Sequence, residues 1–266
     1  MLTTSIIALA AIIPLAAAVT VPACAADACD PAKLDGAYGF QLSGHTTISG
    51  DSKPVVSVGR LVFDGHGVLS GYASVNFAGY FLGNPVTGSY EAHTDCTISW
   101  SLQDDSGAFQ HFSGKLTPDN SSAEFHQSDP GGAQNGVLQK VAAQCSAAGL
   151  APLYSFGIAG GTTPMNPGDV ARQFSAAGSV EPDAAGNLKI TVPGRAPPTA
   201  GTITLDSDCF AQISMALPSG DTVNLRGILV NGGKQILAMQ TDAGATVTAK
   251  FNAKDRSESN GAAGKF

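Results

Sequence analysis

The most constraining feature of this sequence is an internal duplication. Cys29, Leu34, Tyr38 and Phe40 recur in register 116 residues later, in the segment that begins at Cys145. From Gly88 onward the two halves align without a gap at an offset of 113. The matched pairs there include Gly88/Gly201, Asp95/Asp208, Cys96/Cys209, Gly107/Gly220, Gly114/Gly227, Gln127/Gln240 and Asp129/Asp242. Each repeat of roughly 110 residues is long enough to bury its own core, so the chain predicts two similar domains.

The N-terminal segment is read as a targeting signal rather than as part of the fold. Residues 1–25 are uncharged and mostly apolar and end in an Ala-x-Ala pattern, which predicts a signal peptide cleaved after Ala25. An alternative keeps Cys24 as a lipidated N-terminus. The expected domains are residues 26–144 and 145–254, and residues 255–266 are expected to form a disordered tail. The protein is therefore predicted to be secreted or periplasmic, or anchored as a lipoprotein at Cys24.

Cleavage after Ala25 leaves an even number of cysteines, which in an exported protein indicates disulfides. Among the three possible pairings, only Cys29–Cys96 with Cys145–Cys209 treats both repeats alike. This pairing is the prediction.

Charge and composition exclude several classes of function. The net charge is −7 and the sequence has no basic cluster, which argues against nucleic acid as a partner. No stretch of the mature chain is long and apolar enough for a membrane helix. Only 13% of the residues are charged and 32 are Gly, as expected for a β-protein with many turns.

Short alternating runs predict eight antiparallel strands in the first repeat. Their expected starts are near Ala37, Val56, Val68, Ser89, Thr97, Ala108, Ser122 and Gln134. Parity places Tyr38/Phe40/Leu42 and Ile98/Trp100/Leu102 on the buried face, together with their counterparts in the second repeat. The prediction is an all-β protein with two tandem eight-stranded up-and-down barrels. Two β-sandwiches, and a single transmembrane barrel of all the strands, are the alternatives.

The second repeat also predicts a strand register. Asn231-Gly232 is a strong signal for a two-residue type I′ hairpin, which would pair Leu225 with Ala238 and Gly227 with Ile236.

Several motifs of the first repeat together resemble a known module. They are Leu34-x-Gly36-x-Tyr38-x-Phe40, Phe63-Asp64-Gly65-x-Gly67, Thr87-Gly88-x-Tyr90 and Asp95-Cys96-Thr97. This pattern resembles a duplicated module of uncharacterised exported bacterial proteins, which looks like a small lipocalin- or avidin-like barrel. The resemblance implies a fold but no ligand motif. The second repeat departs from it at Ala151-Pro152 and Pro182-Asp183.

Motifs for catalysis are missing from the sequence. It contains no Gly-x-Ser-x-Gly, Ser-x-x-Lys or His-Glu-x-x-His, so we expect a non-enzymatic protein without a cofactor. Asp95 and Asp208 are interpreted as local hydrogen bonders of the backbone. All five histidines lie in the first repeat, and a turn longer than type I′ around Pro118 would make His111 and His126 diagonal neighbours. Such a pair is a weak candidate for a metal site.

The expected binding site is the interior of the first barrel. The candidate ligand-binding residues are Tyr38, Tyr90, Trp100, Phe112, Phe125, Gln127, Tyr80 and Phe81. The first five are aromatic and point inward by parity, and Gln127 points toward one rim. Tyr80 and Phe81 belong to residues 77–83, an unusually apolar connection that is expected to cover a barrel mouth or to dock a partner. The predicted function is binding of a small apolar or aromatic molecule. The alternative is a structural or adhesion module of the cell envelope that meets a cell-surface partner and has no small-molecule ligand.

Overall fold

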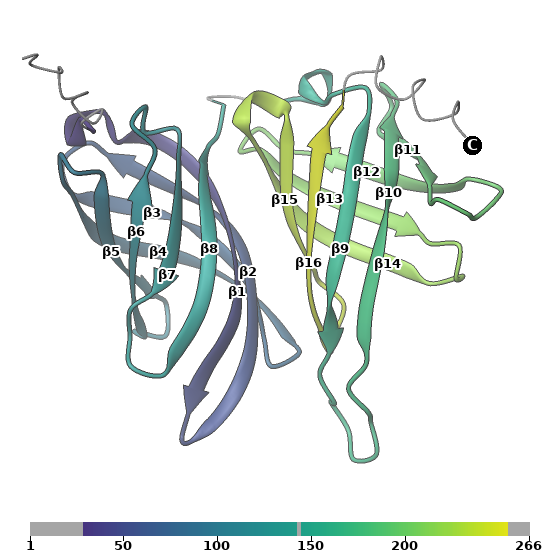
Figure 1. Cartoon of the computed structure of the whole chain (residues 1–266), viewed down its shortest axis with the longest axis horizontal. Coiled ribbons are helices and arrows are strands. Elements are labelled where there is room, and N and C mark those ends of the chain that lie inside the picture. The colour runs from purple at the N-terminus through teal and green to yellow at the C-terminus, as the bar shows by residue number, and fades with distance from the viewer. Residues whose placement is uncertain (1–28, 143–144, 255–266) are drawn as a thin grey trace, which may run out of the picture.

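The structure, a computed structural model, consists of two closed antiparallel barrels that stand side by side (Figure 1). It describes residues 29–142 and 145–254. The first barrel consists of β1 (Asp35–Ile48), β2 (Asp51–Asp64), β3 (Val68–Phe77), β4 (Tyr80–Ala92), β5 (Thr97–Asp104), β6 (Phe109–Leu116), β7 (Ser122–Gln127) and β8 (Gly132–Lys140). The second consists of β9 (Tyr154–Thr162), β10 (Gln173–Pro182), β11 (Asn187–Thr191), β12 (Thr199–Leu205), β13 (Phe210–Ala216), β14 (Thr222–Val230), β15 (Gln235–Gln240) and β16 (Ala245–Ala253).

Closure is of the same kind in both barrels. β1 pairs with both β2 and β8, and β9 pairs with both β10 and β16, while every other strand pairs with its neighbours in sequence. The prediction of two eight-stranded up-and-down barrels is therefore confirmed, and both alternatives, two sandwiches and one barrel of all the strands, are wrong. The expected signal peptide and C-terminal tail lie outside the described residues. Three short 3₁₀ turns, Pro31–Lys33, Ala147–Gly149 and Asn231–Gly233, complete the elements.

The described part of the chain contains no helix with the length and apolar character needed to cross a membrane.

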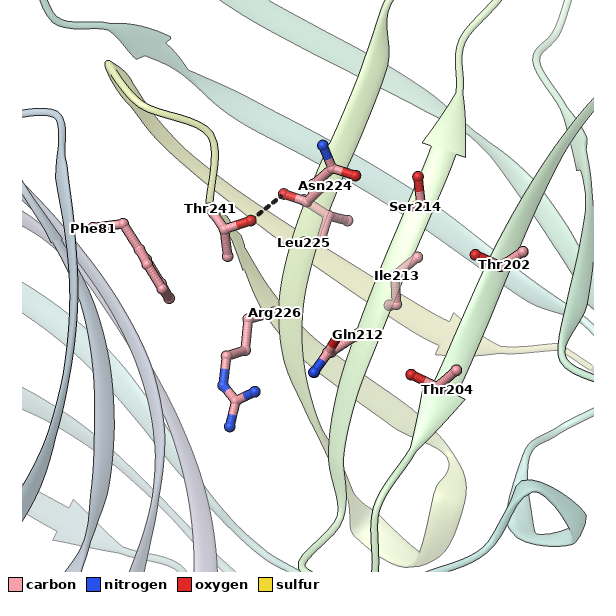
Figure 2. Close-up of a pocket in the computed structure, with 10 residues that line it drawn as sticks. All are labelled: Phe81, Thr202, Thr204, Gln212, Ile213, Ser214, Asn224, Leu225, Arg226 and Thr241. Atoms are coloured by element: carbon pink, nitrogen blue, oxygen red, sulfur yellow. Dashed lines mark hydrogen bonds between the residues drawn. The ribbon is translucent and has the colours of Figure 1, made fainter.

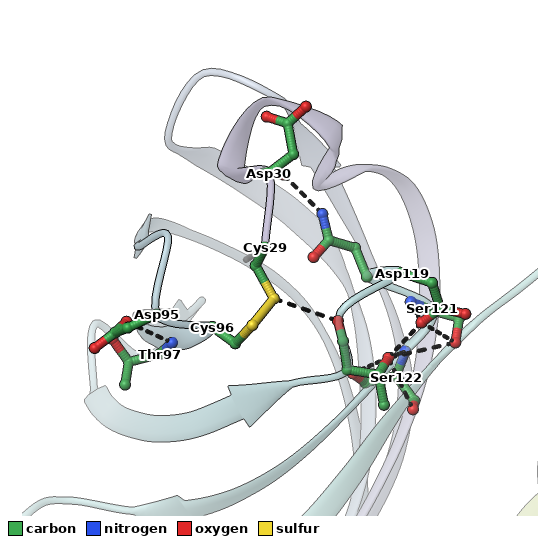
Figure 3. The surroundings of a disulfide bond; sticks show 10 residues. Cys29, Asp30, Asp95, Cys96, Thr97, Asp119, Ser121 and Ser122 are labelled. Atoms are coloured by element: carbon green, nitrogen blue, oxygen red, sulfur yellow. Dashed lines mark hydrogen bonds between the residues drawn. A yellow bond between two sulfur atoms is a disulfide. The ribbon is translucent and has the colours of Figure 1, made fainter. Parts of the chain in front are cut away.

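Both predicted disulfides are present, Cys29–Cys96 and Cys145–Cys209. Each joins the segment before the first strand of a barrel to the turn before its fifth strand. Figure 3 shows the first of them, Cys29–Cys96. Cys96 and Cys209 both adopt a positive φ, of 69° and 72°, in matching turns. Disulfides persist in oxidising compartments, so this pattern indicates a location outside the cytoplasm.

The carboxylates beside these cysteines differ between the repeats. Asp95 accepts hydrogen bonds from the backbone N–H and the hydroxyl of Thr97, as expected, and these bonds lower the pKa of Asp95. The prediction that Asp208 bonds its own turn in the same way is wrong. Asp206 caps the second turn by accepting from the N–H groups of Asp208 and Phe210, and Asp208 instead lies 3.9 Å from Arg60 of the first barrel.

A buried tyrosine closes each barrel in the same way. The Tyr38 hydroxyl donates to the carbonyl of Asn120 at 2.7 Å, and the Tyr154 hydroxyl donates to the carbonyl of Gly233 at 2.7 Å. Asn120 and Gly233 are equivalent positions, and both adopt a positive φ. The tyrosine thus fixes the turn between the sixth and seventh strands to the first strand.

We expect alkaline pH to weaken these two tyrosine hydrogen bonds before it unfolds the rest of the protein. Burial, with a smaller contribution from the Asp35 carboxylate, raises the pKa of Tyr38 to about 12, and burial also raises the pKa of Tyr154. A raised folded-state pKa means full stability below pH ~10 and a loss of about 2–3 kcal/mol as the pH passes ~12. Urea unfolding at pH 9 to 12 measures this loss. The Tyr38→Phe variant should lack that part of the pH dependence, and an identical alkaline slope in the variant would contradict the assignment.

The predicted register of the β14–β15 hairpin is wrong by two residues. Leu225 pairs with Gln240 and Gly227 with Ala238, because the turn contains four residues, 231–234, instead of two. Gly233 belongs to the turn because its carbonyl accepts from Tyr154, and a side chain there would collide with the backbone of Gly149. Since a shift of two preserves parity, the predicted inward faces are still correct.

The expected start of the fourth strand is also wrong. β4 begins at Tyr80 rather than near Ser89, and only Ala78-Gly79 form the turn, with φ values of 50° and 92°. Phe77 pairs with Tyr80, so most of the predicted apolar connection is a continuous β3–β4 hairpin. β4 pairs with β5 only from Val86 onward, so residues 80–85 pair with β3 alone and extend the wall of the barrel at one end.

The outer faces of the two barrels pack tightly against each other. Val56 and Val58 of β2 belong to the same apolar cluster as Ile228 and Val230 of β14. A side chain at Gly39 on β1 would collide with those two residues of β14. The Gln41 amide donates to the carbonyls of Ala238 and Ala249 in the second barrel, at 2.6 and 2.9 Å. These contacts hold the barrels in one fixed arrangement, in which their outer surfaces form shared grooves.

Candidate functional site

The aromatic residues predicted to line a ligand site lie in the interior of the first barrel, where they contact one another. Trp100 stacks on Phe112 with ring centroids 5.5 Å apart, and Phe125 packs edge-on against both rings at 4.9 and 5.6 Å. All three side chains are buried. Their rings thus pack against one another inside the barrel.

The other two predicted aromatic residues form a second interior cluster. Phe63 lies between Tyr38 and Tyr90, with centroid distances of 5.3 and 4.9 Å. The Tyr90 hydroxyl donates to the carbonyl of Leu34 at 3.2 Å, so the hydroxyls of both tyrosines are already bonded to the protein backbone. Both hydroxyls of this second cluster are therefore engaged within the protein.

Gln127 lies at the rim in a network that has a copy in the second barrel. Its amide donates to Asp129, which also accepts from the backbone N–H of His111 and lies 2.7 Å from that residue's ring Nδ1. Burial alone would raise the pKa of Asp129, but these hydrogen bonds outweigh it and the pKa is lowered. In the second barrel Gln240, Asn224 and Asp242 make the equivalent bonds, with an asparagine in place of His111.

This duplication predicts that His111 is a replaceable structural donor. The His111→Asn variant, which copies the second repeat, should keep its free energy of unfolding within about 0.5 kcal/mol of the parent. The His111→Ala variant should lose about 1 kcal/mol at neutral pH, because the side-chain donor to Asp129 is gone. Since the pKa of Asp129 is lowered in the fold, this contribution is present above pH ~4 and disappears as the carboxyl is protonated. Urea unfolding at pH 7 and pH 3 distinguishes the two variants, and equal losses would contradict a donor role.

His111 and His126 are diagonal neighbours, as a longer turn predicts. His126 pairs with Ser113, two residues from His111. The Nδ1 of His111 is engaged by Asp129, and the described residues contain no group of three or more histidine, cysteine or acidic side chains arranged for a metal ion. A metal site at this pair stays a prediction.

A more promising arrangement lies outside the barrels, at the tip of the β3–β4 hairpin. Tyr80, Phe81 and Leu82, here called the apolar tip, are 62%, 41% and 50% exposed. The tip is held in place because the Gly79 carbonyl accepts from the Gly244 N–H of the second barrel at 2.8 Å. Phe81 pairs with the outward-facing Asn76, which places its ring on the side that faces the second barrel.

Phe81 borders a groove of about 420 Å³ on the outer face of the second barrel (Figure 2). Two cross-strand rows of polar side chains form its floor. One row is Thr202, Ser214 and Asn224, and the other is Thr204, Gln212 and Arg226. Thr241 lies beside the first row and donates to the carbonyl of Asn224 at 3.3 Å. We call these residues, together with Phe81, the junction groove.

Arg226 is the only cation that lines the junction groove, and it is held between the barrels. Its guanidinium lies 4.4 Å from the ring centroid of Phe210 and 5.9 Å from that of Tyr72 on the first barrel. Its cross-strand neighbours are Gln212 and Met239, both neutral. Within the described chain it forms no ion pair, and its Nε has no hydrogen-bond partner. The groove thus combines an aromatic ring, neutral hydroxyl and amide groups, and one unpaired positive charge.

A second groove of about 470 Å³ lies between the long β1–β2 hairpin and the β9–β10 region. Its walls are mostly backbone and small side chains, such as Ala159, Gly160 and Gly161, with His45 at one side. Unlike the junction groove, it is lined by neither an arginine nor an aromatic ring of the apolar tip.

Of the residues in the junction groove, the sequence predicts only Phe81 as a binding residue. Arg226 occupies an outward position where the first repeat has Ser113. A large cation among short polar residues on an outward face was the available signal, but parity does not tell which outward face meets the other barrel.

Comparisons with known proteins assign no family. No family model matches the chain, and no curated protein matches it. Among solved structures, the chain is similar to the isotype 1 transferrin binding protein B from serogroup B Neisseria meningitidis. The identity is 6%, the match covers 82% of this chain and 75% of that chain, and the TM-score is 0.29. An overlap this low does not define a shared fold.

Proposed function

We propose that this protein is an exported, non-enzymatic binding module of the cell envelope, and that it binds its partner on the outer surface where the barrels meet. The observation that carries the proposal is the contrast between the two candidate regions. Trp100, Phe112 and Phe125 occupy the interior of the first barrel themselves, whereas the apolar tip is exposed beside the junction groove. Exposed apolar side chains bordered by polar ones are typical of interaction sites. A carrier of small apolar molecules would need an interior cavity instead.

Export is supported by the two disulfides and by the signal-like segment at residues 1–25. The location is then the periplasm or the exterior, and an anchor at Cys24 would hold the module at a membrane surface.

A binding role is also supported by the chemistry of the groove. Its polar groups are hydroxyls, amides and one guanidinium, which orient ligands but do not form a nucleophile–base pair. The His111–Asp129 pair is matched by Asn224–Asp242, and an asparagine does not serve as a proton-transfer group.

The test is saturable binding of the purified protein to envelopes isolated from its own host. The Phe81→Ser/Leu82→Ser variant should weaken this binding about tenfold or more, because it removes the apolar tip. Phe109→Ser is the matched control, since Phe109 is also exposed on the first barrel, at 58%, but does not line the groove. Equal binding by the parent and the tip variant would overturn the proposal.

A further inference from the structure

We propose that the junction groove binds an acidic saccharide, with the sugar carboxylate on Arg226, one sugar face against Phe81, and the ring hydroxyls on the two polar rows. This inference rests on the proposed function and names the ligand class of that site. The chemistry of the lining residues carries it, because each kind of group in the groove matches one part of such a ligand.

The first step is the spacing of the polar side chains. Thr202, Ser214 and Asn224 stand on three adjacent strands, and Thr204, Gln212 and Arg226 stand two residues further along the same strands. Adjacent strands are about 4.8 Å apart and two residues span about 6.7 Å. The groups therefore form a grid about 10 Å by 7 Å, which fits a flat ligand of two or three linked six-membered rings.

The second step is that most of this grid is free to bind a ligand. Among the described residues, Thr202, Thr204, Gln212 and Ser214 make no side-chain hydrogen bond. The equivalent face of the first barrel is different, since Ser89 and Ser101, the counterparts of Thr202 and Ser214, lie 3.3 Å apart and can bond to each other. That face also has Ser113 in place of Arg226. Duplication thus provides an internal comparison, in which only the second barrel has the cation.

The third step is the single charge. The guanidinium of Arg226 lies against the ring of Phe210, and Asp208 is the acidic residue nearest to Phe210 in the sequence. Asp208 lies beside Arg60, and Asp242 is bonded to Asn224 and Gln240. Arg226 is thus left as an isolated guanidinium with a fixed position, which suits one carboxylate. A polyanion such as nucleic acid would need further cations, and the net charge of −7 opposes it.

The fourth step distinguishes a saccharide from a peptide. Peptides commonly bind a sheet by adding a strand to an open edge, which needs unpaired backbone groups. Every strand of the second barrel is paired on both sides, so its outer face offers side-chain hydroxyls and amides instead. Such groups match the many hydroxyls of a sugar, and the exposed ring of Phe81 offers an apolar surface for the C–H face of one ring.

The test measures binding of defined oligosaccharides by calorimetry and by shifts of amide NMR signals. The probes are trisaccharides that contain glucuronic, galacturonic or N-acetylneuraminic acid, each compared with its own methyl ester. The ester keeps every hydroxyl and loses the charge. At least one acid should bind about tenfold more tightly than its ester, with shifts on β12, β13 and β14.

The variants assign the contacts. Arg226→Gln should bring the affinity of the acid down to that of the ester. Thr202→Val/Ser214→Ala should weaken acid and ester alike, and Ser101→Ala, the equivalent change in the first barrel, should change neither. Gln212→Ala keeps the contacts of Arg226 with Phe210 and Tyr72. It should also weaken the binding of acid and ester, and it serves as a second variant if Arg226→Gln does not fold.

The possible outcomes separate this inference from the proposed function. If no acid binds, or if the esters bind as tightly as the acids, the saccharide inference is wrong. Envelope binding that still depends on the apolar tip would then leave the proposed function standing. If an acid binds and Arg226→Gln leaves its affinity unchanged, the assigned contact is wrong and the inference is overturned as well.

Discussion

Removing the Cys29–Cys96 disulfide, by Cys29→Ala/Cys96→Ala, is expected to lower the free energy of unfolding by about 4 kcal/mol. The bond closes a loop with a sequence separation of 67 residues, and a cross-link of that length restricts the unfolded chain by about this amount. It also joins the start of β1 to the β4–β5 turn, where the N–H of Cys29 donates to the carbonyl of Thr94. The variant therefore loses a constraint that spans half of the barrel.

Trp100 fluorescence allows the unfolding of the first barrel to be measured separately. It is the one tryptophan of the chain and is buried in the first barrel, so its fluorescence during urea unfolding reports on that barrel. The matched variant Cys145→Ala/Cys209→Ala removes a bond of nearly equal separation, 64 residues, from the second barrel. We expect it to shift the Trp100 transition too, because Gln41, Val56 and Val58 bind the barrels together. A change below about 1 kcal/mol in both variants would contradict the role of the disulfides.

The internal duplication and the alternation of apolar residues explain what could be predicted from the sequence. The two-fold repetition of Cys, Tyr, Phe and Gly predicted two similar β-domains and both disulfides, because equivalent residues must occupy equivalent places. Alternation predicted the inward faces, and an error of two residues in the β14–β15 register did not disturb them, because parity is unchanged.

The errors arose where contacts are non-local. Asn231-Gly232 is a good two-residue turn in isolation, but the contact of Gly233 with Tyr154 makes the turn longer. Asp208 looked like the copy of Asp95 until the other barrel placed Arg60 beside it. The junction groove is the extreme case, since its residues come from four strands and the β15–β16 turn, in two repeats, and Phe81 meets the others only because the outer faces dock. Periodicity describes the faces of each strand and carries no information about that docking.

Replacing Trp100 with alanine is expected to lower the free energy of unfolding by about 3–5 kcal/mol, because the change leaves a cavity between Phe112 and Phe125. The Trp100→Ile variant copies Ile213, the equivalent residue of the second repeat, and should lose less. Circular dichroism during urea unfolding measures both variants without a tryptophan signal.

Adding indole tests whether the interior of the parent barrel can bind a small aromatic molecule. Indole should raise the melting temperature of Trp100→Ala, because a ligand that fits the new cavity binds the folded state alone. It should leave the parent unchanged, because the rings of Trp100, Phe112 and Phe125 already occupy that space. A rise in the parent's melting temperature with indole, or an extra mass on the parent in native mass spectra, would instead favour an interior carrier of small aromatic molecules. Rescue of the variant alone would exclude the space between these rings as the parent's binding site, since a filled barrel gains a ligand only when one of its own rings is removed.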